Sequence, residues 1–349
     1  MSVSPYNSRD TYFPNMDLMR YALALGVLIA HYNGLAGHSI KYFISSYDCV
    51  GAFFALSGFL VYPSYEKVLN LRKYCINRAR RILPPYFFIV ILCAVGLCFT
   101  STLSWWDYFM SSGFWQYLVT NLCFLNFLHP ELPGVFVGNE YAVSAVNGSL
   151  WTMKVEWCLY LSVPLVIWFI RRFNLNRRKV VISIVLLSVL YRLGLILVFE
   201  QTGREIYHIL SRQFMGQMSY FYVGVMIYFY KDKFQSHLPV MLCLGAILLL
   251  LAHYLPYGYV FLSPVAVGGM VMAISVINKT PDILRHKHNV SYEIYLFHAP
   301  LIQLLIFTGL NGLPVFLSFS ILIVTTVGLS AFCHYFVCLP FLKKKRHYR

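Results

Sequence analysis

The chain has 349 residues, of which 59% are hydrophobic and 12% are charged, and its formal net charge is +15. Soluble domains carry about a quarter charged residues, so this composition excludes an ordinary soluble fold and favours a membrane protein with several spans. The basic residues lie in short blocks between apolar runs, as membrane topology requires, and we therefore expect no nucleic-acid partner.

Windows of about 20 apolar residues predict an all-α polytopic protein with about ten transmembrane helices. The predicted spans are residues 17–35, 49–65, 84–103, 149–170, 180–199, 214–230, 238–255, 259–277, 290–309 and 313–338. Basic residues gather in alternate connections, and the positive-inside rule then places both termini in the cytoplasm. We expect one transmembrane domain over residues 1–342 and a basic cytoplasmic tail over residues 343–349.

The first predicted span begins with Asp17 and carries two further ionisable side chains, Arg20 and His31. These two lie 11 residues apart, which puts both on one helix face, about 16 Å apart along the axis. With Arg20 at the cytoplasmic boundary, His31 would lie about halfway across the hydrocarbon core. Asp17 lies one turn before Arg20 and can pair with it. A boundary ion pair and a satisfied core histidine are the alternative interpretations.

The second predicted span contains the stretch VGAFFALSGFLVY, residues 50–62, in which small residues recur at helical spacing. Such a stripe lets another helix approach closely, so we interpret it first as a packing motif. Ser57 offers a hydroxyl at the same junction.

Arg78 and Arg81 lie one helical turn apart just before the third predicted span, at its cytoplasmic end. Both guanidinium groups can therefore face the same anion. An ordinary positive-inside anchor is the alternative interpretation of this pair.

The longest predicted connection, residues 104–148, lies on the outer side. Its middle piece, FWQYLVTNLCFLNFL, is aromatic and short for a span. It either dips into the membrane as a re-entrant segment or lies along the surface.

Ionisable side chains recur in the later predicted spans. Glu156 and Tyr160 share a face of the fourth span, and Arg192 in the fifth span is a candidate partner for the carboxylate. Tyr295 and His298 lie one turn apart in the ninth span. Polar contacts between helices would explain these residues without chemistry. The nine cysteines show no CxxC spacing and no metal-ligand pattern, so we expect no bound metal.

Taken in chain order, these motifs resemble the acyltransferase 3 family of integral membrane acyltransferases. The matching segments are the Arg-to-His spacing of Arg20 and His31 with the preceding DLMR, the stretch GAFFALSGF, the Arg-x-x-Arg of Arg78 and Arg81, SLWTMKVEW, and SYEIYLFHAPL. The Arg-to-His spacing is the most specific of them. One segment departs from the family: a Glu-x-Pro is common near the end, whereas this chain has Cys338 in VCLPF.

The resemblance implies a membrane O-acyltransferase of the bacterial cytoplasmic (inner) membrane. Its donor would be a coenzyme A thioester, most often acetyl-CoA, and its acceptor a hydroxyl of an extracytoplasmic glycan or glycolipid. Coenzyme A is anionic, so Arg20, Arg78 and Arg81 are candidates to bind its phosphates. The pantetheine arm is about as long as the spacing from Arg20 to His31, and His31 would act as general base. An acyl-histidine intermediate is the alternative step.

The outer half of the predicted cavity holds the candidate acceptor-binding residues, which are Trp151, Glu156, Tyr160, Arg192, Tyr295 and His298. A tryptophan face stacks well on a sugar ring, although Trp151 equally fits an interfacial belt. We assign structural polar roles to Asp17 and Ser57. The acceptor is left open among surface polysaccharide, the O-antigen of lipopolysaccharide, a sialic-acid-like sugar, peptidoglycan and a secreted metabolite. A homo-oligomer is also left open.

Three rival functions remain from the residues alone. A proton-coupled transporter would also bury Arg, His and Glu side chains, but the sequence pattern lacks the repeated halves usual in such carriers. A structural protein of the envelope would tolerate replacement of His31. A different class of membrane acyltransferase would use His298 in place of His31.

Overall fold

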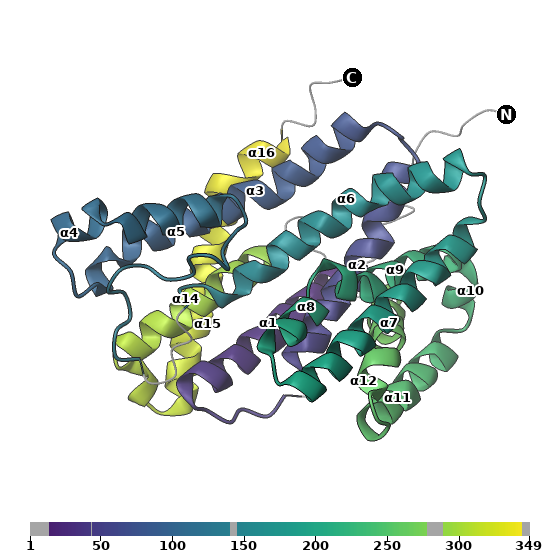
Figure 1. The fold of residues 1–349 in the computed structure, drawn as a ribbon. Helices are drawn as coiled ribbons and strands as arrows, with labels where there is room; N and C mark the ends of the chain where they lie inside the picture. The colour runs from purple at the N-terminus through teal and green to yellow at the C-terminus, as the bar shows by residue number, and fades with distance from the viewer. Residues whose placement is uncertain (1–13, 43, 140–144, 278–288, 344–349) are drawn as a thin grey trace. The chain divides into compact units, whose positions relative to one another are not determined.

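The computed structural model describes residues 14–42, 44–139, 145–277 and 289–343, and the regular elements within those ranges are all helices (Figure 1). The expected all-α fold is therefore confirmed for this part of the chain. The predicted basic tail lies, apart from its first residue, outside the described residues, as does a short part of the predicted outer loop.

The chain divides into two compact units. The first unit consists of Met1–Leu23, Val50–Asn70 and Leu159–Asn289, and the second consists of Ala24–Cys49, Leu71–Cys158 and Val290–Arg349. Three helices contribute residues to both units: α1 (Pro14–Ala36), α2 (Ser46–Glu66) and α6 (Trp151–Arg172). The single transmembrane domain expected from the sequence stays a prediction.

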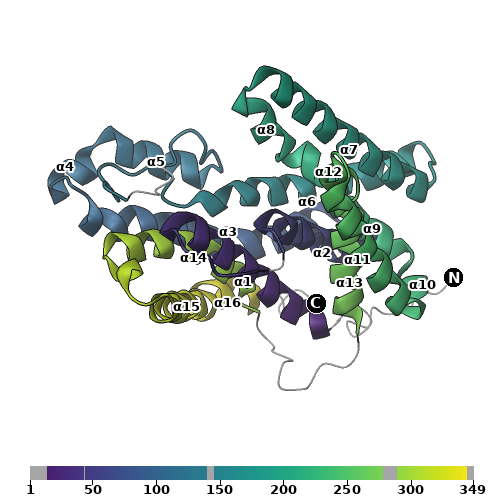
Figure 2. The ribbon, with the colours of Figure 1, turned by 90° about the horizontal axis from the view of Figure 1, so that it is seen from below.

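The first unit is built mainly from its third segment, Leu159–Asn289. Its remaining helices are α7 (Arg177–Thr202), α8 (Glu205–Ser211), α9 (Phe214–Phe229), α10 (Lys231–Ser236), α11 (Leu238–Tyr254), α12 (Gly258–Phe261) and α13 (Ser263–Val276). α9 packs beside α7 and α13, and α11 packs on α13 (Figure 2). α7 begins and ends on local signals. The side chain of Asn176 caps its first turn, and Gly203 ends it with φ at +66°.

The close helix approach predicted around Ser57 is present in the first unit, where α2 packs against α9. A Cβ atom on Gly58 would lie 1.9 Å from the carbonyl oxygen of Phe221. A Cβ atom on Gly224 would lie 1.9 Å from the carbonyl oxygen of Ala55. Both glycines therefore put backbone against backbone, which only a residue without a side chain permits. The packing motif predicted in the second span is confirmed.

The remaining described helices belong to the second unit. They are α3 (Leu71–Gly96), η2 (Leu97–Thr100), α4 (Trp105–Met110), α5 (Ser112–Leu122), η3 (Gly148–Leu150), α14 (Ser291–Phe307), η5 (Leu310–Gly312), α15 (Val315–Phe332), the π-helix η6 (Cys333–Cys338) and α16 (Leu339–Lys343). α14 and α15 lie side by side (Figure 1, Figure 2). In the predicted outer loop, α5 packs on α3, and the Tyr86 hydroxyl donates to the carbonyl of Asn121 at 2.6 Å. Whether this segment enters the membrane stays a prediction.

The helix that contains the third predicted span, residues 84–103, begins well before that span. α3 already begins at Leu71, so Arg78 and Arg81 lie inside the helix and not in a connection before it. Arginine is a good helix former, and a helix can extend past its apolar segment because the charged turns remain in water. The eighth predicted span is divided into α12 and α13. Elsewhere the helices begin and end within a few residues of the predicted spans.

By length and composition, four helical segments in the described ranges are able to cross a membrane. They are Leu71–Thr100, Gly148–Arg172, Arg177–Thr202 and Val315–Leu342. Only 28% of the apolar window of the third segment and 22% of that of the fourth are buried, so large apolar side chains cover their outer faces. Such surfaces suit lipid and not water. The helices therefore indicate a multi-pass membrane protein, while the count of ten spans stays a prediction.

Candidate active site

The second half of α1 and the middle of α14 meet in the second unit, where they bring His31 and His298 together. His31 Nδ1 lies 2.7 Å from His298 Nε2, and the rings stack with centroids 4.9 Å apart and planes 17° apart. His298 is fully buried, whereas His31 is half-buried. From the sequence, His31 and His298 were alternative candidates for the catalytic histidine, whereas in the structure they are hydrogen-bonded to each other.

The hydrogen bonds of the pair assign its protons. His298 Nδ1 lies 3.3 Å from the carbonyl oxygen of Ile294, and a carbonyl only accepts, so this nitrogen carries the proton. In the neutral ring, Nε2 of His298 is then an acceptor, and His31 Nδ1 donates to it. Nε2 of His31 is left with its lone pair. Within the described ranges, the contact with His298 is the one hydrogen bond made by the His31 ring.

The segment before α6 completes the surroundings of His298. Pro300 has no N–H, so the carbonyl of Leu296, one turn earlier, loses its helical donor. The side-chain amide of Asn147 replaces that donor at 2.9 Å, and its oxygen accepts from the N–H of Ser149 to begin η3. Ser149 Oγ then lies 3.3 Å from His298 Nε2. Asn147 precedes an apolar run, which is a helix-start signal that could have identified it from the sequence.

Tyr295 connects the histidine pair to α6. Its ring centroid lies 5.7 Å from that of His298, and its hydroxyl lies 2.9 Å from Thr152 Oγ1. Glu156, one turn further along α6, interacts electrostatically with Tyr295. Trp151 lies half-buried at the start of α6, and its stacking on a sugar stays a prediction. The second unit thus brings His31, His298, Tyr295 and Glu156 into one neighbourhood.

The arginine pair lies on α3, which runs parallel to α14. The Tyr292 hydroxyl donates to the carbonyl of Ile82 at 3.4 Å. Further along both helices, the rings of Phe88 and Phe297 lie 6.1 Å apart. Because both contacts advance in the same direction, the two helices keep one register over this length.

This register relates the arginines to the histidines. His298 follows Tyr292 by six residues on α14, and Arg78 precedes Ile82 by four residues on α3. At 1.5 Å per residue, the guanidinium and the imidazole are therefore about 15 Å apart along the helix axes. This distance is close to the spacing of about 16 Å expected between Arg20 and His31 on α1. Arg78 is half-buried and Arg81 is exposed.

The first unit holds the other predicted polar residues. Arg20 pairs with Asp17 at 3.3 Å, as expected, and the Asn289 side chain donates to the same carboxylate at 2.8 Å. Ser57 Oγ lies 3.3 Å from the hydroxyl of Tyr160. α1 is one continuous helix from Pro14 to Ala36, so the placement of Arg20 and His31 on a single helix is confirmed.

Arg192 is buried in α7 of the first unit, with its guanidinium carbon 5.5 Å from the centre of the Tyr220 ring. Glu156 belongs to the second unit. The predicted pairing of Arg192 with Glu156, and a shared cavity for Glu156 and Tyr160, therefore stay predictions.

A second buried pair carries no signal in the sequence. His334 Nδ1 lies 2.8 Å from Glu293 Oε1, and both side chains are almost fully buried. His334 belongs to η6, where Cys333 Sγ and Cys338 Sγ lie 3.8 Å apart. Glu293 also interacts with the Cys338 thiol. The buried ion pair and the π-helical turn, a feature frequent at functional sites, distinguish this end of α15 from an ordinary apolar helix.

The arrangement suits acid–base chemistry. One imidazole presents an unprotonated nitrogen, a second imidazole fixes its orientation, and hydroxyl groups surround the pair. In the part of the chain that the structure describes, no group of three or more His, Cys, Asp or Glu side chains is placed to hold a metal ion.

Comparisons with known proteins show similarity to acyltransferases. The model of a family described as an acyltransferase domain matches residues 13–335. The chain is 22% identical over 301 residues to an O-acetyl transferase of Shigella phage Sf6, covering 84% of this chain and 85% of that protein. It is 27% identical over 174 residues to nodulation protein 10 of Rhizobium leguminosarum bv. viciae. That alignment covers 46% of this chain and only 46% of that relative. No solved structure matches the chain significantly.

Proposed function

The chain belongs to the acyltransferase 3 family and is an acyltransferase, and from this premise we propose that it moves an acetyl group from cytoplasmic acetyl-CoA to a hydroxyl of an extracytoplasmic glycan or glycolipid. The observation that carries the proposal is the hydrogen-bonded pair of His31 and His298, with His298 anchored on a backbone carbonyl. Family membership favours this chemistry over the proton-coupled transporter that composition left open.

His31 is the general base of the proposed step. Its Nε2 removes the proton of the acceptor hydroxyl while the hydroxyl oxygen attacks the thioester carbonyl. The C–S bond breaks, and the proton held by His31 passes to the departing thiolate of coenzyme A. The products are an acetyl ester and free coenzyme A. The half-buried position of His31 supports this role, because a base must be reached by substrate.

His298 is a positioning residue for His31. It accepts from His31 Nδ1 and thereby holds the tautomer in which Nε2 is free to act as a base. When His31 takes a proton, the same contact disperses the charge. Ser149, 3.3 Å from His298 Nε2, supports the ring in this orientation.

Arg78 and Arg81, together with Arg20, bind the phosphates of coenzyme A in this proposal. The distance of about 15 Å from Arg78 to the level of His298 suits a pantetheine arm that reaches from the phosphates to the imidazole. Guanidinium groups are good partners for phosphate because their planar donors match its oxygens.

The acceptor side is assigned to Trp151, Glu156, Tyr160, Tyr295 and Arg192. In this proposal the protein crosses the bacterial inner membrane ten times, with both termini in the cytoplasm, so the sugar enters from the outer side. The acceptors that suit this topology are surface polysaccharides such as the O-antigen of lipopolysaccharide.

The experiment uses purified protein in lipid nanodiscs, acetyl-CoA labelled in its acetyl group, and lipid-linked glycan extracted from the host membrane. We expect label to appear in the glycan, with one thiol of coenzyme A released for each acetyl transferred. Label that stays on coenzyme A in the presence of glycan would overturn the proposal. Labelled protein trapped in the absence of acceptor, and lost in His31→Ala, would assign the acyl-histidine route and not direct transfer.

A further inference from the structure

Arg192 is a buried cation in the second half of α7. Its side chain is 2% exposed, yet Nε and Nη1 make no hydrogen bond with any residue that the structure describes. A buried guanidinium without a counter-charge is strongly unfavourable, and ionisable groups inside membrane proteins usually face a cavity or a ligand. A bound anion would offset this cost.

Packing in the first unit holds the arginine in place. One turn before it, the Ser188 hydroxyl donates to the carbonyl of Met215 at 2.6 Å, which ties α7 to α9. At Gly216 a Cβ atom would lie 1.9 Å from the carbonyl oxygen of Ser211 and 3.0 Å from Cγ of Arg192. The ring of Tyr220 lies 5.5 Å from the guanidinium. The aliphatic stem is thus clamped by neighbours, while donors of the head group remain unused.

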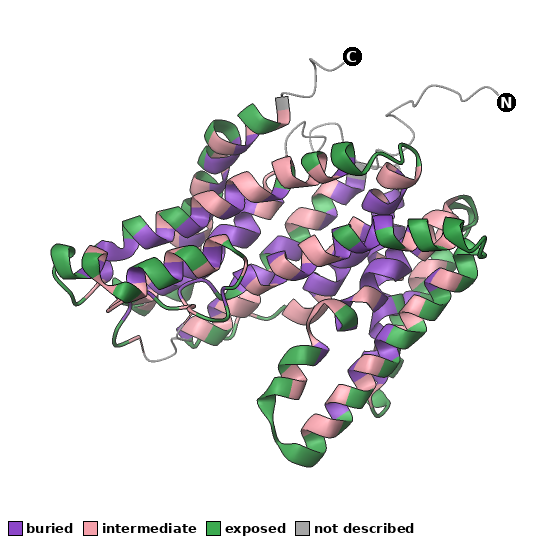
Figure 3. Cartoon of the chain, turned by 45° about the horizontal axis from the view of Figure 1, so that its top comes forward, coloured by how far each residue is buried: buried purple, intermediate pink, exposed green. Residues whose placement is uncertain are grey.

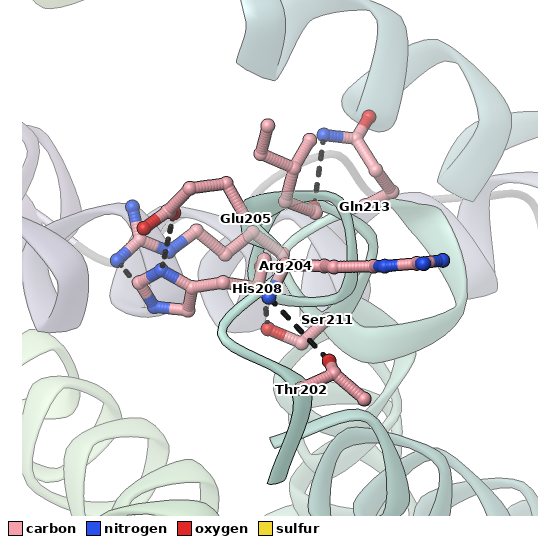
Figure 4. A network of polar contacts seen from close by, with 8 residues as sticks. Thr202, Arg204, Glu205, His208, Ser211 and Gln213 are labelled. Atoms are coloured by element: carbon pink, nitrogen blue, oxygen red, sulfur yellow. Dashed lines mark hydrogen bonds and ion pairs between the residues drawn. The ribbon is translucent and has the colours of Figure 1, made fainter. Parts of the chain in front are cut away.

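The acidic side chains at the same end of the first unit are already engaged. Glu200 Oε2 accepts from the Tyr257 hydroxyl at 2.6 Å. Glu205 lies 3.8 Å from His208 Nδ1, and its side chain is largely exposed (Figure 4). Neither carboxylate forms an ion pair with Arg192 in the described ranges.

Positive charge gathers around this end. Arg212 Nη2 lies 2.8 Å from His208 Nε2, and both Arg192 and Arg212 interact electrostatically with Tyr259. The turn between α7 and α8 is exposed (Figure 3). It carries Arg204, whose side chain extends away from His208 (Figure 4). Three arginines therefore oppose two glutamates here, which favours an anionic ligand.

We propose that Arg192 is the anchor of an oxyanion subsite, and that the acceptor of the transfer reaction carries a matching carboxylate or phosphate. The identity of the ligand as the acceptor rests on the proposed function, whereas the anion site itself does not. A guanidinium held by packing and already desolvated loses little further freedom when it binds a carboxylate or phosphate oxygen. The acceptor is thereby an acidic sugar or a phosphate-linked sugar, and not a neutral glycan.

The test measures binding of three probes to the purified full chain in nanodiscs: sodium glucuronate, inorganic pyrophosphate and glucose. We expect one or both anions to bind by calorimetry and to raise the unfolding midpoint, and glucose to do neither. Arg192→Met should weaken anion binding at least about tenfold, because a charge-assisted hydrogen bond is lost. Arg172→Met, which removes an exposed arginine from the last turn of α6, should leave binding unchanged.

The two anions separate the sources of the charge. Binding of glucuronate alone assigns an acidic sugar, and binding of pyrophosphate alone assigns a phosphate-linked sugar. Pyrophosphate can also occupy the proposed coenzyme A site, so its binding is measured again in Arg78→Gln with Arg81→Gln. Anion binding that does not depend on Arg192 would overturn the proposal.

Stability distinguishes a ligand anchor from a structural arginine. Without ligand, Arg192→Met and Arg192→Gln should unfold at the same temperature as the parent protein or higher, because each removes an unpaired buried charge. A lower midpoint in both variants would make Arg192 structural and overturn the proposal. If anions bind through Arg192 but no acetyl is transferred, the proposed function fails and the anion site stands. If Arg192→Met and the parent transfer acetyl equally well to a neutral glycan, the proposed function stands and the anionic acceptor proposed for Arg192 is overturned.

Discussion

Within each of the two units, the helices are held together by a different kind of contact. In the first unit, α2 and α9 meet backbone to backbone at Gly58 and Gly224, with no space for a Cβ atom. In the second unit, side-chain contacts join α14 to α1 at His31 and His298 and to α6 at Thr152 and Tyr295. The difference shows that substitutions should act in opposite ways. A methyl group added in the first unit should disturb folding, whereas a polar group removed in the second should disturb chemistry.

The largest expected effect is the loss of transfer in His31→Ala. Removal of a general base typically lowers the rate by 10²–10⁴-fold, so we expect about a thousandfold loss of transfer from acetyl-CoA. The unfolding midpoint should change little, because His31 is only half-buried. Transfer within tenfold of the parent protein would remove His31 from the chemistry.

Gly58→Ala should have the largest effect on stability. Its new Cβ would lie 1.9 Å from the carbonyl oxygen of Phe221, so α2 and α9 must move apart, at a cost of about 3 kcal/mol. Gly269→Ala is the matched control, since nothing lies within 4 Å of a Cβ at that helical position. The control should gain up to about 1 kcal/mol. Chemical denaturation in detergent measures both, and equal stabilities would contradict the close approach.

His298→Ala should reduce transfer less than His31→Ala does, by about a hundredfold, because the base remains but its tautomer is no longer held. His298→Gln supplies a side-chain oxygen that can accept from His31 Nδ1, and it should recover part of the rate. A purely structural role for His298 predicts no such recovery. The readout is kcat at saturating acetyl-CoA, together with the unfolding midpoint of each variant.

Arg78→Gln combined with Arg81→Gln should raise KM for acetyl-CoA about tenfold at low salt and leave kcat nearly unchanged. The difference from the parent protein should shrink at high salt, because screening already weakens the interaction of exposed guanidinium groups with phosphate. An unchanged KM at low salt would show that both arginines serve only as positive-inside anchors that set the membrane topology.

Thr152→Val should have the smallest effect. The variant loses the contact of 2.9 Å with the Tyr295 hydroxyl and the hydrogen bond of 3.0 Å to the carbonyl of Ser149. We expect about 1 kcal/mol of destabilisation and a severalfold lower rate. Thr202→Val is an exposed control, since among the described residues that hydroxyl bonds only to its own helix and to the following turn. Equal losses in both variants would argue against a special role for the contact between α6 and α14.

Local patterns in the sequence were sufficient to predict most of the helices. Apolar run lengths predicted helices close to those observed, and the small residues of the second span predicted the close approach seen at Gly58. The early start of α3 does not follow from apolarity, because arginine also favours a helix. The resemblance to a family, based on ordered motifs, agrees with the match over residues 13–335.

What the sequence determined by itself is therefore the helical class, the single helix that carries Arg20 and His31, and the family, because each depends on spacing along one stretch of chain. Only the tertiary structure decided that His31 pairs with His298, 267 positions away. It also decided that the Asn147 side chain donates to the carbonyl of Leu296, which lacks its helical donor because of Pro300. Which helices pack together, and in which register, depends on contacts between distant segments. A periodic pattern within one helix does not record them.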